Sequence, residues 1–490
     1  MRNRILLLSS AALLAACYTT PALHEPTVRV APVYGVVAPV AAPLEEQGAK
    51  TTVNAMIASV PSVRYRTSDA AAPFWRDLGD TALTTLITEA LRASPSIRSA
   101  EARLAGARAA RRLAAFDLFP TVTASGSALR SQQSVGQIPG ALSQFPRRDL
   151  YDVGFDASWE LDIFGRTQRT VGAQKALTAS AGYAVEDVQV SLAAEVARTY
   201  FDMRGAERQL AVAKRNAENQ RHTVSLTEDR LRAGRGTAFD TERARSVLQL
   251  TLASVPSLEA QISAHRYRLA TLLGRTADEL PASVYAAADL PRLPDSLDVG
   301  SPAQLIRHRP DVLRAERLVA ANELFVSASR ADYLPTFSIG ASGGYAATRL
   351  QSLTTAGTSR FFVGPMVSFP LLDIGRVRQR VAAAGTREDE SRAEYDATVL
   401  QAVEEAQTSL VAYDRAHARV AVLTEAVRAS THAAELAQQR FAGGLTDFFQ
   451  VLDAQRTLLD AENQLAVAHT SAATALVVIY KSVGGVWGRQ

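Results

Sequence analysis

Leu161-Asp162-Ile163-Phe164-Gly165-Arg166 is the stretch of sequence that decides the fold, because the chain contains it twice. The second copy reads Leu371-Leu372-Asp373-Ile374-Gly375-Arg376, so that Gly375 lies 210 residues after Gly165. The same offset links Arg230 with Arg440 and Gly234 with Gly444 further along the chain. A constant spacing held across several motifs indicates that the chain consists of two copies of one unit.

The duplication also extends upstream, with a slightly different offset. Leu118-Phe119-Pro120-Thr121 recurs as Tyr333-Leu334-Pro335-Thr336, which places Pro335 215 residues after Pro120. We therefore predict a first repeat over residues 73–274 and a second repeat over residues 301–490. A segment over residues 275–300, which contains three prolines, joins the two repeats.

Each repeat is predicted to run in the order helix, two strands, long helix, glycine turn, helix. The first helices cover residues 80–115 and 301–331, and the prolines at 120 and 335 end them. The strands lie within about residues 120–164 and 335–373, where apolar and polar residues alternate. In the first repeat the alternation places Val153, Phe155, Ala157, Trp159 and Leu161 on one face, and Asp152, Gly154, Asp156, Ser158 and Glu160 on the other.

Strands of this length, about ten residues, cross a bilayer when they are tilted. Four strands cannot close a barrel, and open sheet edges are not tolerated in lipid. If these strands lie in a membrane, several chains must share one barrel. An ordinary water-soluble sheet of four strands is the alternative that the strand pattern leaves open.

The longest helices are predicted over residues 166–231 and 376–441, neither of which contains a proline. At 1.5 Å per residue each would be about 100 Å long. Apolar residues recur every seven positions, which indicates left-handed supercoiling against neighbouring helices. The first seam consists of Val196, Met203, Leu210, Ala217, Val224 and Leu231. The second seam, 210 residues later, consists of Ala406, Tyr413, Val420, Val427, Ala434 and Phe441. Further helices follow over residues 237–273 and 447–483, so the fold class is mainly α with a small β part.

The N-terminus has the composition of an export signal. Within residues 1–16, two arginines precede an apolar run, which is the arrangement of a signal peptide. The run is too short to span a membrane. Leu14-Ala15-Ala16-Cys17 resembles a bacterial lipobox, which implies cleavage before Cys17 and acylation of this residue. The alternative is a plain secretory signal with an incidental cysteine. Residues 17–72, rich in Pro, Ala, Val and Thr, are predicted to form an extended tether.

Composition excludes several classes of function. A single cysteine among 490 residues excludes an intramolecular disulfide and a zinc site built on several thiolates. A formal net charge of +4 without a basic block argues against nucleic acid as a partner. No catalytic constellation or metal-ligand spacing is evident, so we expect no enzyme, no cofactor and no metal. After the signal no run of about 18 apolar residues occurs, so no membrane-spanning helix is expected.

An ordered set of motifs resembles the TolC-like outer-membrane efflux factors, and specifically the lipoprotein subset associated with resistance–nodulation–division (RND) pumps. The motifs in the first repeat are Phe74-Trp75-Arg76-Asp77-Leu78 and Trp159-Glu160-Leu161-Asp162-Ile163-Phe164-Gly165-Arg166. Those in the second repeat are Arg309-Pro310-Asp311-Val312, Leu334-Pro335-Thr336, Pro370-Leu371-Leu372-Asp373-Ile374-Gly375-Arg376, Arg440-Phe441-Ala442-Gly443-Gly444 and Val451-Leu452-Asp453-Ala454-Gln455-Arg456. Together these motifs cover nearly everything after residue 72.

The resemblance implies a homotrimer in the outer membrane. Three chains of four strands would close one twelve-stranded barrel, continued by a helical tunnel into the periplasm. Residues 275–300 would belong to a belt around the tunnel. The implied partners are outer-membrane lipid, a periplasmic adaptor and an inner-membrane RND pump, and the implied function is the passive exit of drugs or other small toxic compounds. The exit duct of a protein secretion system and a non-conducting, lipid-anchored envelope protein are the alternatives.

The resemblance also implies where function lies along the helices. The turns that reverse the helices contain Gly234, Arg235, Gly443, Gly444 and Leu445, and in this family such turns meet the adaptor. Just inside these turns, Asp240 and Asp453 fall on carboxylate positions of the family's entrance constriction. Arg243 and Gln450 complete the predicted gate, although Gln450 and Thr446 depart from the residues that better-known members carry there. The alternative is that both aspartates are ordinary solvated helix residues.

Overall fold

The computed structural model describes residues 63–66, 74–134, 136, 146–286, 288–299, 301 and 306–484. The predicted signal peptide, Cys17 and most of the predicted tether lie outside the described residues. The chain divides into two compact units, and each unit takes segments from both repeats. The described part of the first unit consists mainly of residues 102–182 and 314–396, and the second unit holds the rest.

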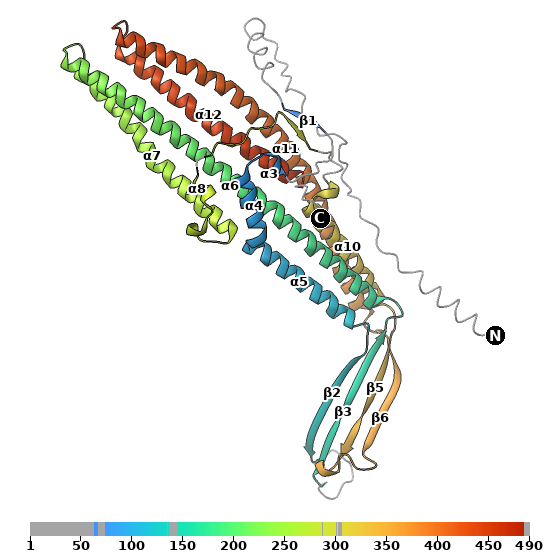
Figure 1. Cartoon of the computed structure of the whole chain (residues 1–490). Helices are drawn as coiled ribbons and strands as arrows, with labels where there is room; N and C mark the ends of the chain where they lie inside the picture. Colours follow the sequence, from blue (N-terminus) through green and yellow to red (C-terminus); the bar gives the residue numbers. More distant parts are fainter. Residues whose placement is uncertain are drawn as a thin grey trace. The chain divides into compact units, whose positions relative to one another are not determined.

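The first unit contains a four-stranded antiparallel sheet (Figure 1). Its strands are β2 (Thr121–Ser131), β3 (Arg148–Leu161), β5 (Thr336–Ala347) and β6 (Ser359–Ser368), hydrogen-bonded in the order β2-β3-β5-β6. Each repeat contributes one hairpin, and β3 pairs with β5 to join the two hairpins. The two strands predicted for each repeat are therefore confirmed.

The predicted helix over residues 80–115 is wrong as one continuous element. It is two helices, α4 (Thr81–Ala93) and α5 (Pro95–Phe116), and Ser94 between them has an extended backbone with φ −59° and ψ 133°. The ring of Pro95 disfavours the helical conformation at the residue before it. The second repeat shows the same effect, because α10 (Pro310–Ala331) begins at a proline and not at residue 301.

The long helices follow the prediction within two residues at each end. They are α6 (Arg166–Arg232) with 67 residues and α11 (Ile374–Ala442) with 69 residues. Each is followed by a shorter helix, α7 (Ala238–Leu273) or α12 (Phe448–Ser482). Side chains of Thr237 and Asp447 accept hydrogen bonds from the first turns of these shorter helices, which places the helix starts.

The core of the second unit lies where these helices pack side by side. Part of the predicted heptad seam is buried there, because a 3.5-residue period keeps one side of a helix facing its partner. Leu210 and Val224 are half-buried, and Leu231 is exposed. Buried seam residues are Val196, Met203 and Ala217 in α6, and Ala406, Tyr413, Ala434 and Phe441 in α11. A cluster around Tyr200 and Phe201 also takes in Leu83 from α4, Leu269 from α7 and Val477 from α12.

The segment between the repeats packs on this core through short elements. They are η3 (Ala277–Glu279), α8 (Ala282–Tyr285) and β4 (Ser296–Asp298). Part of the predicted tether joins them, because β1 (Arg64–Arg66) pairs in parallel with β4. Val63 N donates to Asp414 Oδ1 at 3.0 Å, and the Tyr65 hydroxyl donates to the carbonyl of Leu410 at 2.7 Å. Residues 63–66 are thus fixed to α11 and not part of a free tether.

A buried arginine anchors the start of α10. Arg309 Nη2 lies 2.6 Å from Asp311 Oδ2 and 2.9 Å from Glu405 Oε2, and its Nη1 donates to the carbonyl of Ser482. Burial by itself would raise the pKa of Asp311, but the hydrogen bonds and charge of Arg309 outweigh burial and leave this pKa below its ordinary value. Folding therefore favours the ionised form of the Asp311 carboxylate.

One described helix, α12, is long and apolar enough to pass a length-and-composition test for a membrane span. Such a single match is weak evidence, because the core helix of a packed protein passes the same test. Residues such as Ala472, Leu476 and Ile479 of α12 are buried among the neighbouring helices. We therefore interpret α12 as a core helix of the second unit.

Candidate functional site

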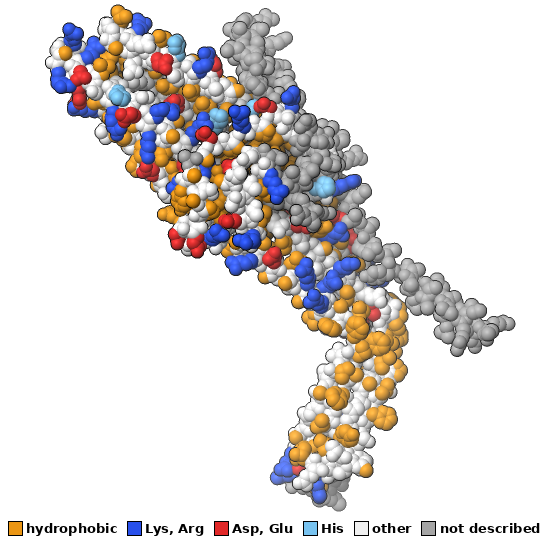
Figure 2. All heavy atoms as spheres, viewed as in Figure 1, with side chains coloured by type: hydrophobic (Ala, Val, Ile, Leu, Met, Phe, Trp, Pro, Cys, Tyr) orange, Lys and Arg blue, Asp and Glu red, His pale blue; other side chains and the backbone are white. Residues whose placement is uncertain are grey.

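The sheet has one apolar face that lies open to its surroundings. The strand register places most apolar residues of the four strands together on this face, although Phe362 and Met366 of β6 lie on the other. They are Val122, Ala124 and Ala128 in β2, Val153, Phe155, Ala157 and Trp159 in β3, Phe337, Ile339, Ala341 and Tyr345 in β5, and Phe361, Val363 and Val367 in β6. The Phe361 side chain is 88% exposed and Val363 is 69% exposed. Figure 2 shows hydrophobic side chains along the strands.

The opposite face of the sheet is mainly polar. Thr123, Ser125 and Ser127 of β2 lie beside the acidic residues of β3. Ser125 Oγ donates to Asp156 Oδ2 at 2.9 Å, and Arg360 forms an ion pair with Asp152 across the sheet. A sheet that is apolar on one side and hydroxyl-rich and charged on the other suits lipid on the first side and water on the second.

The turns that reverse the helices have the same geometry in both repeats. Gly234 has φ 67° and Gly444 has φ 72°, a left-handed conformation that glycine adopts without steric cost. In the first turn the amides of Gly234 and Arg235 donate back to Leu231 and Arg230. Leu445 N donates to the carbonyl of Arg440 in the second turn. Both turns are therefore Schellman caps, and they expose the predicted docking residues Arg235 and Leu445.

The predicted gate residues divide into two groups. Asp240 and Arg243 line a cleft of about 310 Å³ beside the turns, whereas Gln450 and Asp453 are not among the residues that line it. Asp240 Oδ2 accepts a hydrogen bond from the Thr237 hydroxyl at 2.7 Å. The Arg243 guanidinium lies over the Phe449 ring, 4.9 Å from its centroid, which joins α7 to α12.

The other two gate residues lie along α12. The Gln450 backbone N–H donates to Oδ1 of the N-cap residue Asp447 at 3.1 Å, and the Gln450 side-chain oxygen accepts from the Thr446 hydroxyl at 2.5 Å. Asp453 is exposed one turn further on. The hydrogen bond between Thr446 and Gln450 is neutral, so these two positions contribute no charge to the entrance region of a single chain.

Arg230 braces the two turns, and the sequence did not identify this role. Its Nη1 donates to the carbonyl of Phe441 at 2.7 Å, and its guanidinium lies 4.2 Å from the centroid of the Phe441 ring. The Phe441 ring in turn lies 5.4 Å from that of Phe448. The recurrence of Arg230 as Arg440 was visible, but the contact joins positions more than 200 residues apart and has no local signal.

No group of three or more His, Cys, Asp or Glu side chains that could hold a metal ion occurs among the described residues. Cys17, the predicted lipidation site, lies outside the part of the chain that the structure describes. The candidate functional features of the described residues are a two-faced sheet and a paired set of helix turns.

Comparison with known proteins agrees with this arrangement. The chain is 28% identical to outer membrane protein OprJ of Pseudomonas aeruginosa over 412 residues, which is 83% of this chain and 85% of OprJ. It is 29% identical to the pyoverdine export outer membrane protein OpmQ of Pseudomonas putida, over 99% of this chain and 98% of OpmQ.

Solved structures show the same fold. The outer-membrane channel OprN superposes with a TM-score of 0.82 at 36% identity, covering 88% of this chain and 95% of OprN. The open state of the MtrE outer membrane channel of Neisseria gonorrhoeae gives a TM-score of 0.80 at 24% identity, covering 96% and 98%. The family model described as "Outer membrane efflux protein" matches residues 86–275 and 302–485. The chain belongs to the outer membrane efflux protein family.

Proposed function

We propose that this protein is the outer-membrane exit duct of a tripartite efflux system, which passively conducts drugs or other small toxic compounds from the periplasm to the exterior. Membership in the family places the chain in the outer membrane. The observation that carries the proposal is the sheet, whose apolar face is exposed along β2, β3, β5 and β6 while its other face is polar.

The sheet needs further strands to close. Among the described residues of one chain β2 and β6 are the two outer strands of the sheet, and each has one edge without a partner there. Unpaired backbone groups cost several kcal/mol each in hydrocarbon, and therefore open edges are not found in contact with lipid. Three copies related by a threefold axis would pair β2 of one chain with β6 of the next and close a twelve-stranded barrel. We infer that the functional unit is this homotrimer.

The helix turns provide the surface for a periplasmic adaptor. Arg235 and Leu445 lie at the two turns, and the Leu445 side chain is 73% exposed. Cysteines at these two positions provide a test, because a crosslinker placed there should capture the adaptor protein that links the duct to an RND pump. Crosslinks that form equally from Arg221, which lies on the exposed side of α6 away from the turns, would contradict docking at the turns.

The entrance beside these turns would act as the gate. Asp240 and Asp453, each present three times around the axis of a trimer, would concentrate negative charge there, attract cations and repel one another. Arg243 would hold α7 and α12 together through Phe449 while the entrance is closed. Gln450 would contribute a neutral hydrogen bond with Thr446 to this gate, and no charge.

Cys17 would attach the trimer to the inner leaflet of the outer membrane. Each buried acyl methylene contributes about 0.8 kcal/mol, so several chains on one cysteine give firm anchoring.

The oligomeric state is tested by native mass spectrometry of the protein extracted in detergent. A complex of three chains supports the proposal, and a folded monomer would contradict it.

A further inference from the structure

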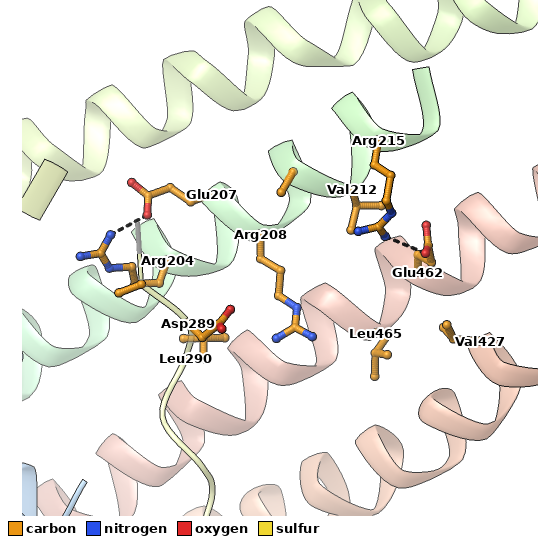
Figure 3. A pocket seen from close by; sticks show the side chains of 12 residues that line it. Arg204, Glu207, Arg208, Val212, Arg215, Asp289, Leu290, Val427, Glu462 and Leu465 are labelled. Atoms are coloured by element: carbon orange, nitrogen blue, oxygen red, sulfur yellow. Dashed lines mark hydrogen bonds and ion pairs between the residues drawn. The ribbon is translucent and has the colours of Figure 1, made fainter. Parts of the chain in front are cut away.

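A cavity of about 540 Å³ lies within the second unit, and none of its lining residues belongs to the helix turns. Figure 3 shows that α6 forms one wall, α12 and α11 form the opposite side, and the loop around Leu290 crosses between them. Half of the residues that line it are apolar: Ala211, Val212, Ala288, Leu290, Val427 and Leu465. This volume lies within the range of about 300–1,000 Å³ that is typical of small-molecule sites.

The charged groups that line the cavity are three arginines, Arg204, Arg208 and Arg215, and three carboxylates, Glu207, Asp289 and Glu462. Glu207 is shared by two guanidinium groups, since its Oε2 lies 2.7 Å from Arg204 Nη1 and its Oε1 lies 2.9 Å from Arg266 Nη2. A second pair, Arg215 with Glu462 at 2.7 Å, is balanced. Arg266 is not among the residues that line the cavity, so the lining itself has no net charge.

Arg208 adds a cation that has no hydrogen bond or ion pair within the described part of the chain. In Figure 3 its side chain extends from α6 across the cavity towards α12. Burial and the charge of Arg208 lower the pKa of His469 on α12, which favours the neutral form of this ring. Asp289, which also lines the cavity, is exposed and forms no ion pair with Arg208.

Arg204 also lines the cavity, and its guanidinium is held by other groups of the same chain. Its side chain is only 1% exposed, and its two terminal nitrogens donate to the carbonyls of Ala286 and Ser283 as well as to Glu207. Its Nε is nevertheless buried without an acceptor, and the same holds for Nε of Arg266. Buried donors without acceptors are rare because each loses its hydration without compensation.

We propose that this cavity is a binding site for a small organic anion, a carboxylate or phosphate group joined to an apolar body. The guanidinium of Arg208 would bind the anionic group in a two-pronged fashion. The apolar body would lie against Val212, Leu290 and Leu465. Because the belt loop around Leu290 forms one side of the cavity, bound anion would connect this loop to α6 and α12. The site does not depend on whether the protein conducts.

The probe for the test is 2-naphthoate, titrated by calorimetry into the full-length protein in detergent, with empty micelles as the blank. Saturable binding of one probe per chain is expected, and the neutral analogue 2-naphthalenemethanol should bind about tenfold or more weakly. Arg208→Gln should weaken naphthoate binding by about tenfold or more. Arg221→Gln is the matched control, because Arg221 lies on the same helix, pairs with Glu218 and does not line the cavity.

Asp289→Asn gives an independent arm. Removal of this carboxylate should tighten naphthoate binding by about threefold or more, because like charges beside a bound anion repel it. Absence of saturable binding, equal affinity of Arg208→Gln and wild type, or unchanged affinity in Asp289→Asn would each overturn the proposal. If Arg208→Gln fails to fold, the proposal is tested by the naphthoate affinity of Asp289→Asn compared with that of Arg221→Gln. Channel conductance of the same variants separates failure of this site from failure of the proposed duct.

Discussion

An arginine at Val363 tests the assignment of the two sheet faces. Val363 lies in the middle of β6, on the apolar face, and pairs with Ala341 in the neighbouring strand. Its side chain is exposed within the chain, so an arginine there meets no packing obstacle. Ser342 is the matched control position, because it lies next to Ala341 at the same level but on the polar face, directly opposite Asp156.

The magnitude follows from the environment on each face. An arginine that faces lipid at the middle of the bilayer costs about 2–4 kcal/mol per chain. In a trimer with three copies of Val363→Arg the cost is roughly 6–12 kcal/mol, comparable with the whole stability of a typical domain. Ser342→Arg instead places its charge in water beside the Asp156 carboxylate, so its expected change in stability is less than about 1 kcal/mol.

The assay is refolding of each variant into lipid vesicles across a urea series, with the folded fraction measured by gel mobility without heating. We expect Val363→Arg to fold only at urea concentrations well below those that wild type tolerates, and Ser342→Arg to match wild type. Equal stability of the two variants, or greater loss in Ser342→Arg, would refute the assignment of the apolar face to lipid.

Four further predictions concern the helices and the anchor. Asp453→Ala should loosen the entrance, raise single-channel conductance and increase sensitivity to large antibiotics; unchanged values of both would count against its role in the gate. Cys17→Ser should abolish acylation, and labelled fatty acid still attached to the variant would contradict the lipobox. Gly444→Ala should lower the free energy of unfolding by about 1–2 kcal/mol, because only the left-handed backbone opposes the new methyl group, whereas Gly443→Ala should have little effect on the same denaturant curve. Asp311→Asn should lower the melting temperature relative to wild type near neutral pH. The two melting temperatures should converge as pH falls below about 4, because the stabilising ionised form of Asp311 is lost when pH passes through the lowered pKa. A difference in melting temperature that is independent of pH would contradict this.

Most of the architecture could be predicted because it is periodic. The alternation around Phe155 has a period of two, and the seam through Val196 and Met203 has a period of seven, so strands and long helices were both identifiable from one sequence. The turns at Gly234 and Gly444 were predictable because a left-handed helix end favours glycine. These features depend on neighbours that are close in sequence.

The features that were missed have two different causes. The break in the first helix was visible in the sequence, since Pro95 biases Ser94 towards an extended backbone, but the apolar pattern continues across it. Pairing of residues 64–66 with 296–298 had no local signal, because it joins segments that are far apart in the chain.

Close packing between the repeats was likewise invisible. A methyl group on Gly205 would lie 2.1 Å from Thr470 Oγ1, so α6 and α12 approach closely at this position. The sequence contains a glycine in a helix, but it does not reveal the partner that requires it. The position of Arg208 in the cavity and the contact of Arg230 with Phe441 depend in the same way on packing between the two repeats.

Electrical recording from the folded trimer in a planar lipid bilayer tests the central claim most directly. If the protein is an exit duct, purified trimer should insert and produce discrete single-channel steps, and Asp453→Ala should enlarge them. A folded trimer that inserts into the bilayer but yields no single-channel conductance, in wild type and in the Asp453 variant, would contradict the account.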